Sequence, residues 1–286
     1  MRVYRLAVVI LLLLAVIVVF NIKCSSSNSA ENDDRPTYFV TTDPSAKVEA
    51  KRKADGKKKV DVDIPAPLKN TPEQILVRKG YVVSYNKKTR LPNWVAWRLT
   101  AEHTDGPAKR PNNAWHEDTD VPSPRATSSD YKGSGWTRGH MCPAGDNKWD
   151  ATAMRESFLF TNICPQNHYL NKYEWNALEN LCRDWARRYG AIDIVCGPLY
   201  TSSTPKTIGR GHVRVPDGFF KVIMCRTGQA KAIGFIFKND GRKVALDDVV
   251  CTVDEVEQAT GIDFYPALDD RLENRIEASA RLNEWQ

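Results

Sequence analysis

This sequence of 286 residues has no internal repeat and no pair of cysteines at Cys-x2-Cys spacing. The first absence excludes a solenoid built from repeats, and the second argues against a structural zinc site. Acidic residues are missing before Glu31, and apolar residues are sparse between the N-terminal apolar segment and about Gln74. We therefore expect one packed core, and we place it in the later part of the chain.

The N-terminus lacks the run of about 20 apolar residues that a membrane-spanning helix needs. Instead, Arg2 and Arg5 precede 15 uninterrupted apolar residues, at positions 6–20. A charged flank followed by a short apolar run is typical of an export signal. We expect residues 1–23 to be a signal peptide or, because Ile22 extends the run, a signal anchor.

Export predicts a protein that is periplasmic, anchored to the cell envelope or secreted. Cys24 and the three serines after it indicate a lipidated cysteine, although Lys23 directly before it fits that interpretation poorly. Membrane attachment through the N-terminal segment therefore stays open. In an exported protein the remaining cysteines are expected to form disulfides, whose pairing the sequence does not determine. They are Cys142, Cys164, Cys182, Cys196, Cys225 and Cys251.

Residues 24–70 are polar and rich in lysine, and we interpret them as a flexible polar and basic tether. Residues 71–286 then form one folded domain. The formal net charge is +6, of which Arg2, Arg5 and Lys23 contribute half. A mildly basic protein is compatible with a polyanionic substrate but does not require one.

Strand-like segments are rich in valine, isoleucine and aromatic residues. They lie at residues 80–85, 94–99, 157–163, 192–196, 219–225 and 230–237. Residues 86–93 carry turn residues, so the first two segments are expected to form a hairpin. Gly197-Pro198 predicts a turn after the fourth segment. Residues 101–132 are rich in proline, aspartate and asparagine, and we expect a long functional loop there.

Apolar residues at three- and four-residue spacing predict helices over residues 173–189, 252–259 and 268–282. Gly190 is expected to end the first of them. Thr252 and Glu255 match a capping box at the start of the second. Strands and helices are mixed without a regular βαβ rhythm, which predicts an α+β fold.

The most informative segment contains Thr137-Arg-Gly-His140. Hydrolysis of a phosphodiester needs a base for water, positive charge at phosphorus, and a proton or metal for the leaving oxygen. His140 can supply the base, because neutral imidazole accepts a proton near pH 7. Gly139 lets the backbone turn tightly or approach another segment closely. His168 is a rival base or substrate contact without this setting. His103, His116 and His212 also lack it, and we expect surface or structural roles for them.

Asn171 lies 31 residues after His140, and Trp175 and Glu179 follow it at four-residue intervals. Such spacing predicts that the three side chains share one helix face. We expect Asn171 just before the first turn, where its amide oxygen can bind a hard cation such as Mg²⁺. Glu179 would hold the waters of that ion, and Trp175 would pack the helix on the sheet.

Six segments between about residues 74 and 270 together resemble the DNA/RNA non-specific endonuclease family. They are Tyr81-Val-Val-Ser-Tyr-Asn86, Trp94-Val-Ala-Trp-Arg-Leu-Thr100, Thr137-Arg-Gly-His140, Thr161-Asn-Ile-Cys-Pro-Gln166, Asn171-x3-Trp175-x3-Glu179 and Gly197-Pro-Leu-Tyr200. This family comprises the ββα-metal (His-Me finger) nucleases, which include secreted bacterial nucleases and mitochondrial endonuclease G. The resemblance implies an α+β fold with a central, mainly antiparallel sheet flanked by helices.

The resemblance also implies a role for each matching residue. His140 matches the general base, Asn171 the single protein ligand of Mg²⁺, and Glu179 the acid that orients metal-bound water. Mn²⁺ or another divalent cation is expected to substitute for Mg²⁺. Arg138 matches the arginine of the Arg-Gly-His segment, which holds phosphate.

Two positions are less settled by the resemblance. The family has an arginine in the preceding loop that stabilises the transition state, and here Arg110 is the better match and Arg125 the alternative. The family usually has aspartate where this chain has Thr137. Threonine can also bond locally to backbone, so we expect little loss of chemistry, with the orientation of His140 in question.

The resulting hypothesis is an exported, Mg²⁺-dependent endonuclease that cleaves DNA and RNA with little sequence specificity. No segment resembles a base-reading helix module, and contacts to the phosphate backbone carry no sequence code. The alternative is a catalytically weak or inactive surface protein that binds nucleic acid on the same fold. A structural envelope protein is a third hypothesis, and a homodimer is compatible with all of them.

Overall fold

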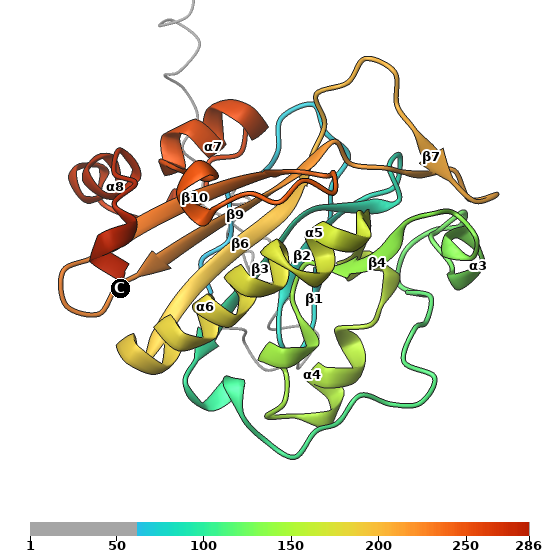
Figure 1. Ribbon diagram of the computed structural model, residues 1–286, viewed down its shortest axis with the longest axis horizontal. Helices are drawn as coiled ribbons and strands as arrows, with labels where there is room; N and C mark the ends of the chain where they lie inside the picture. The colour runs from blue at the N-terminus through green and yellow to red at the C-terminus, as the bar shows by residue number, and fades with distance from the viewer. Residues whose placement is uncertain (1–61, 286) are drawn as a thin grey trace, which may run out of the picture. The chain divides into compact units, whose positions relative to one another are not determined.

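The computed structural model describes residues 62–285. Within them, a central sheet has the spatial order β1-β2-β3-β6-β9-β10-β11 (Figure 1). All neighbouring strands of this sheet are antiparallel, which confirms the α+β fold with a mainly antiparallel sheet. Its strands are β1 (Gln74–Val77), β2 (Val82–Asn86), β3 (Leu91–Thr100), β6 (Ala191–Leu199), β9 (Gly218–Cys225), β10 (Lys231–Lys238) and β11 (Val250–Cys251).

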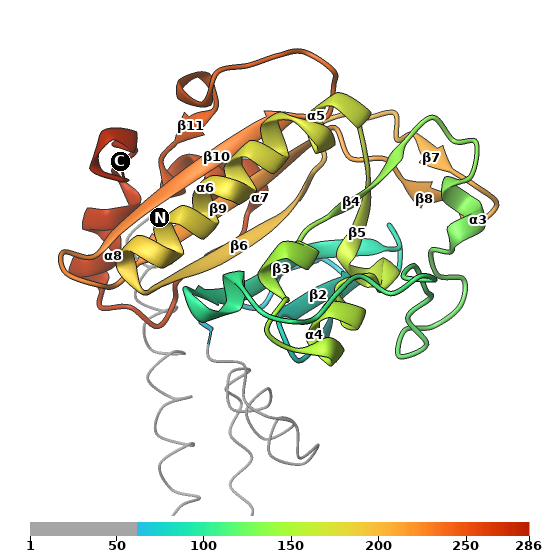
Figure 2. The same ribbon diagram turned by 60° about the horizontal axis from the view of Figure 1, so that its bottom comes forward.

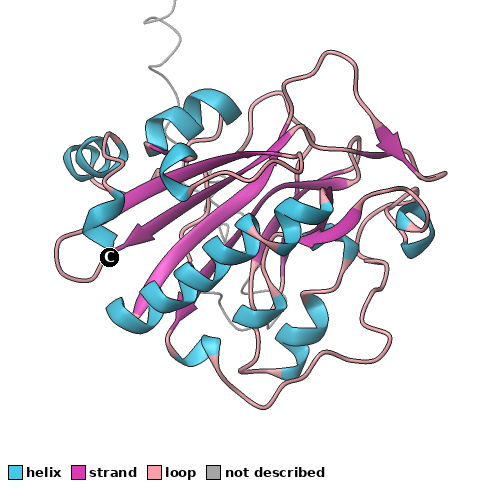
Figure 3. Cartoon of the chain, in the orientation of Figure 1, coloured by secondary structure: helices cyan, strands magenta, loops and turns pink. Residues whose placement is uncertain are grey.

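Helices and two short ribbons surround this sheet (Figure 3). The helices are α3 (Ser128–Tyr131), α4 (Ala151–Glu156), α5 (His168–Lys172), α6 (Glu174–Tyr189), α7 (Val253–Thr260) and α8 (Asp270–Glu277). The ribbons pair β4 (Thr137–His140) with β5 (Ile163–Gln166), and β7 (Thr207–Ile208) with β8 (Val213–Arg214).

Successive side chains along each strand point to opposite faces of the sheet. Both faces are buried, each within its own core cluster. In β9, Phe219 and Ile223 pack with Trp175 and the rest of the apolar stripe of α6. Phe220 and Val222 point the other way and share a core with α7 and α8. Figure 2 shows α6 lying along one side of the sheet. The result is a layered molecule with α6 on one face of the sheet and α7 and α8 on the other.

The predicted helix over residues 173–189 is confirmed as α6. Its buried side chains recur at helical spacing and include Trp175, Leu178, Cys182 and Trp185. Gly190 follows at a φ of 84°, a conformation that glycine adopts without steric cost. The predicted hairpin is also present as β2 and β3, and β6, β9 and β10 match the three later strand predictions.

The C-terminal predictions hold in part. Helix α7 begins after Thr252, whose Oγ1 accepts a hydrogen bond from the Glu255 backbone at 3.1 Å, so the capping box is confirmed. The helix predicted over residues 268–282 is shorter. It divides into α8 and a 3₁₀ turn at Leu282–Trp285.

The strand predicted over residues 157–163 is wrong. The segment is buried as expected, but it forms a turn and a 3₁₀ segment at Phe160–Asn162, and β5 begins only at Ile163. Asn162 explains the difference, since its Nδ2 donates to the carbonyls of Ser157 and Cys142, each at 2.8 Å. The apolar content of residues 157–163 correctly predicted that the segment is buried. Its backbone conformation, however, is determined by side-chain hydrogen bonds.

The turn predicted at Gly197-Pro198 is also wrong, because both residues continue β6 opposite Phe220 and Phe219. Strand β3 pairs with β6 only as far as Cys196, so the missing N–H of Pro198 removes no hydrogen bond to β3. Gly197 allows a close approach there, since a Cβ would lie 2.4 Å from the Asn93 carbonyl oxygen.

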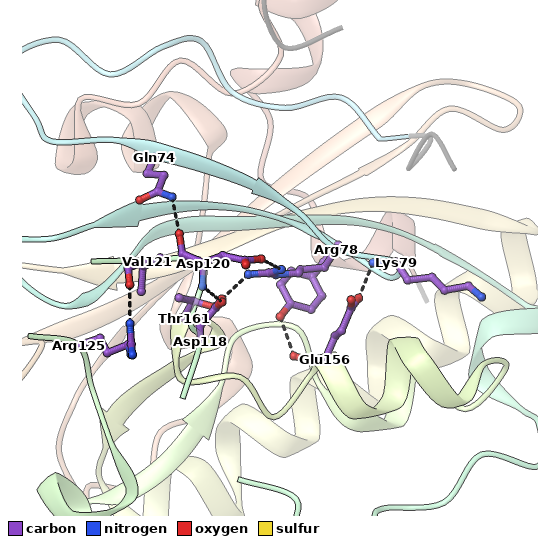
Figure 4. A network of polar contacts seen from close by, with 10 residues as sticks. Gln74, Arg78, Lys79, Asp118, Asp120, Val121, Arg125, Glu156 and Thr161 are labelled. Atoms are coloured by element: carbon purple, nitrogen blue, oxygen red, sulfur yellow. Dashed lines mark hydrogen bonds and ion pairs between the residues drawn. The ribbon is translucent and has the colours of Figure 1, made fainter. Parts of the chain in front are cut away.

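The long loop predicted over residues 101–132 is present, with a 3₁₀ turn and α3 as its regular elements. Arg78, next to β1, fastens it by ion pairs with Asp118 and with Asp120, the latter at 2.6 Å (Figure 4). Thr161 donates a second hydrogen bond to the Asp118 carboxylate at 2.6 Å. Gln74 adds a bond to the Asp120 carbonyl at 2.8 Å. The loop is thereby held on the edge of the sheet.

The prediction of disulfides is wrong for the described residues, in which all six cysteines are free thiols. Five are buried in the core, where a thiol packs as a small apolar group. Cys196, for example, donates to the Met141 carbonyl at 3.3 Å. The even number of cysteines therefore does not indicate disulfides in this domain, where the buried cysteines contribute to packing.

The predicted signal segment and most of the predicted tether lie outside the described residues. The boundary at residue 71 stays a prediction. Val62, at the start of the described chain, is buried, and Ile64 and Leu68 pack against the same core cluster. Between residues 62 and 285, the helices are all too short or too polar to cross a membrane.

Candidate active site

The Arg-Gly-His segment forms a strand, not the turn expected from its sequence. It is β4, which pairs with β5 so that Gly139 lies opposite Cys164 and His140 opposite Ile163. Close approach explains the glycine. A Cβ on residue 139 would lie 2.1 Å from Oε1 and 2.7 Å from Cβ of Gln166. The two strands therefore pack more closely than any larger residue at position 139 would allow.

His140 ends β4 inside an aromatic cage. Its ring centroid lies 5.1 Å from that of Trp115 and 5.0 Å from that of Phe158. Its carbonyl accepts a hydrogen bond from Trp175 Nε1 at 3.3 Å, which ties β4 to α6. Its Nε2 is buried and has no hydrogen-bond partner among the described residues. Burial and the nearby Arg110 charge lower the pKa of His140 to about 3, so the imidazole is neutral at pH 7.

Two arginines share the Trp115 ring with His140. The guanidinium carbon of Arg110 lies 5.2 Å from the ring centroid of Trp115, and that of Arg138 lies 5.4 Å from it. Arg138 also donates to Ser128 Oγ at 2.9 Å. Cation–π contact of this kind holds a guanidinium without neutralising it. The arrangement concentrates positive charge beside an unprotonated imidazole.

Trp115 is a site residue that the sequence analysis missed. It contacts His140, Arg110, Arg138 and two phenylalanines, and so organises the site. A tryptophan five residues after Arg110, in a loop otherwise poor in apolar residues, was the available signal.

Arg125, the alternative to Arg110, lies elsewhere. Its Nε pairs with Glu117 at 3.0 Å, and its Nη1 donates to the Val121 carbonyl at 2.8 Å. Figure 4 shows it next to the network that fastens the long loop. Arg110, in contrast, is the charge that lowers the pKa of His140. Geometry therefore supports Arg110 as the arginine beside the base.

The spacing predicted that Asn171, Trp175 and Glu179 share one helix face. In the structure, Asn171 lies outside the helix that carries the other two. It lies in α5, and the helical conformation is interrupted at Tyr173, with φ −114° and ψ −80°, before α6 begins. Its Nδ2 donates to Thr137 Oγ1 at 3.0 Å, and Thr137 Oγ1 donates to the Gln166 carbonyl at 2.7 Å. In the described part of the chain, none of the hydrogen bonds uses Asn171 Oδ1. An amide oxygen of this kind is a ligand that hard divalent cations prefer.

Glu179 projects from the middle of α6 and is half-buried. Burial raises its pKa to about 7, although the Lys221 ammonium opposes this rise. Lys221 is fully buried, and its Nζ lies 4.3 Å from the Trp175 ring centroid. Sequence reasoning missed Lys221, because a lysine within an apolar strand reads as an interruption. A charged group beneath α6 thus acts on the predicted site carboxylate.

His103, His116 and His168 lie in surroundings that differ from those of His140. His103 stacks on Trp149 with ring centroids 4.6 Å apart, and His116 bonds to the Ala114 carbonyl at 2.6 Å. His168 is exposed on α5 beside Tyr169. None of these three has the pair of arginines that surrounds His140.

Fold and site together have the arrangement of a ββα nuclease, in which a two-stranded ribbon and the following helices carry the histidine and the asparagine. A family model described as DNA/RNA non-specific endonuclease matches residues 64–271. The chain therefore belongs to the DNA/RNA non-specific endonuclease family, as its motifs indicated.

Individual relatives agree with this assignment. Mitochondrial nuclease EXOG of Xenopus laevis is 37% identical over 206 residues, which cover 66% of this chain and 58% of that protein. Mitochondrial endonuclease G of Bos taurus is 33% identical, covering 68% of this chain and 69% of that protein. Nuclease C1 of Cunninghamella echinulata var. echinulata is 35% identical, covering 70% and 85%. The chain spans less than two thirds of the length of the EXOG relatives.

A solved structure agrees as well. The crystal structure of an EndoG/EndoGI complex, described as showing the mechanism of EndoG inhibition, superposes with a TM-score of 0.67. The sequences are 25% identical, and the match covers 70% of this chain and 89% of that one. The predicted nuclease fold is confirmed.

The predicted export is contradicted. The EXOG and endonuclease G relatives are named as mitochondrial proteins and not as exported ones. A short apolar run after basic residues does not identify, by its composition alone, the membrane to which it directs a chain. Residues 1–23, on which the prediction of export rested, lie outside the described residues.

Proposed function

We propose that this protein is a divalent-metal-dependent endonuclease that hydrolyses phosphodiester bonds in DNA and RNA with little sequence specificity. One observation carries the proposal: His140, whose Nε2 has no hydrogen-bond partner among the described residues, packs on the same tryptophan ring as Arg110 and Arg138. A neutral base and two cations in one place suit the chemistry of phosphodiester cleavage.

His140 acts as the general base and takes a proton from the attacking water. Its low pKa keeps the imidazole unprotonated over the whole physiological range, and the Trp175 bond to its carbonyl holds the backbone that carries the ring. A base of such low pKa is weak in the free protein. Binding of a phosphate beside Arg110 would offset that arginine's charge and raise the proton affinity of His140.

Arg110 and Arg138 bind the phosphate and stabilise the negative charge that grows on it. Neither forms an ion pair with a carboxylate among residues 62–285. Their positive charges are therefore available to a polyanion. Because both arginines would contact phosphate, they would read the backbone and not the bases.

Asn171 would hold the divalent ion through Oδ1, and Mg²⁺ is the ion we propose, with Mn²⁺ as a substitute. Held at this residue, such an ion would supply positive charge to the phosphate and its leaving oxygen. Thr137 fixes which amide atom of Asn171 faces outward by accepting a bond from Nδ2. The ionised Glu179 carboxylate would accept hydrogen bonds from the water molecules of that ion.

Cleavage by the full-length chain tests the proposal. Supercoiled plasmid and RNA are incubated with Mg²⁺ or with a chelator, for the wild type and for His140→Ala. His168→Ala is the matched control, because His168 is a nearby exposed histidine outside the aromatic cage. We expect metal-dependent cutting of both substrates, unaffected in the control and reduced by about 10²–10⁴-fold in His140→Ala.

Persistent cutting by His140→Ala, or in the presence of chelator, would overturn the mechanism. Cutting of DNA alone would retain the mechanism and narrow the substrate. Tight binding of DNA by folded wild-type protein, without cleavage under any divalent metal, would favour the alternative of an inactive nucleic-acid-binding protein.

A further inference from the structure

A group of three carboxylates lies away from the candidate active site, on the helices that cover the other face of the sheet. Asp254 and Glu257 come from α7, and Glu277 ends α8. One oxygen from each of the three lies within 4.8 Å of the other two. Val253, Val256 and Ile276 beside them belong to the core cluster on that face, whereas Trp175 and the rest of α6 pack on the opposite one.

Glu277 distinguishes this group from an ordinary acidic surface. Its side chain is 5% exposed, and its Oε1 is buried with no hydrogen-bond partner among the described residues. A buried carboxylate oxygen without a donor carries a large desolvation cost, which a counter-ion would remove. The hydroxyl of Tyr265, which is fully buried and interacts electrostatically with Glu277, also lacks a partner.

The charges that act most strongly on Glu277 are of its own sign. After burial, the groups that raise its pKa are Glu257, Glu273, Asp254 and Asp263. Burial also raises the pKa of Glu257, although the backbone N–H of Phe264 donates to its Oε1 at 2.9 Å. Carboxylates that repel one another in a partly desolvated environment are stabilised either by bound protons or by a cation.

We propose that Asp254, Glu257 and Glu277 form a binding site for a divalent cation of the calcium class, which joins α7 to α8. Ca²⁺ binds oxygen at about 2.3–2.6 Å, so two ligands on opposite sides of the ion lie about 5 Å apart. The spacing of the three carboxylates lies within that limit. Mg²⁺ requires near-ideal octahedral geometry and gives up its waters reluctantly, so an open site of three carboxylates suits the more flexible coordination of Ca²⁺ better.

Exposure sets the expected affinity. Asp254 is exposed and Glu257 is partly exposed, so water completes the coordination and the ion exchanges with solvent. Three carboxylates in such an open site resemble the weaker calcium modules, whose dissociation constants are about 10⁻⁴–10⁻³ M. The ion would act on the C-terminal helix and would have no part in the cleavage chemistry.

Calorimetric titration of Ca²⁺ into the full-length chain tests the site. The background is Asn171→Ala, which removes the proposed active-site ligand, so the outcome does not depend on nuclease activity. We expect one site of the affinity given above, and at least a tenfold loss of affinity in Glu277→Gln. Glu273→Gln is the matched control on the same helix, and it should change the affinity by no more than about fivefold.

Thermal unfolding adds a second readout. At a Ca²⁺ concentration 100 times the dissociation constant, the ratio of folded to unfolded protein should rise about 100-fold, and not in Glu277→Gln. Without metal, Glu277→Gln should be more stable than its parent, because it removes like-charge repulsion. Asp254→Asn, at an exposed position, provides a second test of binding if Glu277→Gln does not fold.

Two outcomes would overturn the proposal. One is the absence of saturable binding of Ca²⁺, Mg²⁺ or Mn²⁺ in the Asn171→Ala background. The other is binding that survives both Glu277→Gln and Asp254→Asn unchanged. Either result would indicate that these carboxylates share protons instead, in agreement with the raised pKa of Glu277, which is about 8.

Discussion

Asn171 Nδ2 donates a hydrogen bond to Thr137 Oγ1 at 3.0 Å, and this bond joins helix α5 to strand β4. Thr137 in turn donates to the Gln166 carbonyl on β5 at 2.7 Å. The threonine therefore uses its single hydroxyl both to accept and to donate. It occupies the position where the family usually has aspartate, and there it orients the side chain that we propose to bind the metal.

Replacing Thr137 by valine should weaken metal binding. Valine keeps the β-branched shape but removes the acceptor for Asn171 Nδ2, so the amide can rotate away from its productive orientation. Loss of such an outer partner typically costs about 10–100-fold in metal affinity or activity. We expect the Mg²⁺ concentration for half-maximal cleavage to rise by that factor, with kcat at saturating Mg²⁺ changed much less.

Thr137→Ser is the matched control, because serine retains the hydroxyl. It should behave like the wild type in the same Mg²⁺ titration. A Thr137→Val enzyme with unchanged metal dependence would show that the hydrogen bond does not position the ligand.

The helices around Asn171 illustrate which structural features the sequence could predict and which it could not. Apolar periodicity located α6 through Trp175, Leu178 and Trp185, because burial against the sheet imposes it. The spacing from Asn171 to Trp175 suggested one helix, but the helix is interrupted at Tyr173, at the end of α5, which packs against β4. Such a break results from tertiary contacts, which local sequence does not contain.

Contacts between distant segments account for the other omissions. Trp115 and Lys221 come from a loop and from a buried strand, and both meet the site only through the fold. Gly139, in contrast, was correctly expected to allow close approach. Local residue types therefore indicated the chemistry, whereas the surroundings that tune each group required the structure.

Arg110 and Arg125 should differ sharply when each is replaced by alanine. Arg110 contacts Trp115 and Phe158 beside His140, so its loss removes the charge that we propose to stabilise the transition state. Removal of one such group typically costs about 10²–10³-fold in kcat. Arg125 pairs with Glu117 at a partly exposed place, and Arg125→Ala should keep kcat within about fivefold of the wild type. Single-turnover cleavage of plasmid measures both, and a reversed order would assign the role to Arg125.

The pH dependence of cleavage should reflect Glu179 and not His140. The pKa of His140 is lowered to about 3, so its protonation does not limit activity near neutrality. Burial raises the pKa of Glu179 to about 7, so the ionised form increases as the pH rises through that value. We expect kcat/KM to rise about tenfold per pH unit below pH 7 and to level off above it. Glu179→Gln should give a lower and flatter profile.

The stability of the protein should move in the opposite direction. The folded pKa of Glu179, about 7, lies above the value of 4.5 for an unperturbed glutamate, so the folded chain binds more protons between these two values. This contribution is complete below pH 4.5 and is lost as the pH rises through 7. Urea unfolding of the wild type and of Glu179→Gln should therefore show the difference between them changing over this window. A constant difference would remove Glu179 as the titrating group.

Gly139→Ala should impair the site by forcing β4 and β5 apart. The added Cβ would meet Gln166 Oε1 at 2.1 Å and Gln166 Cβ at 2.7 Å, and Gln166 is fully buried and has little room to move. Overpacking of this kind costs about 1–3 kcal/mol of unfolding free energy. Because His140 is the next residue, cleavage should fall further than stability alone explains. Gly241→Ala is the control, since its Cβ would meet only ordinary contacts of 3.4 Å or more. Urea unfolding and plasmid cleavage are measured on both variants. Equal stability and equal cleavage in Gly139→Ala and Gly241→Ala would contradict this prediction.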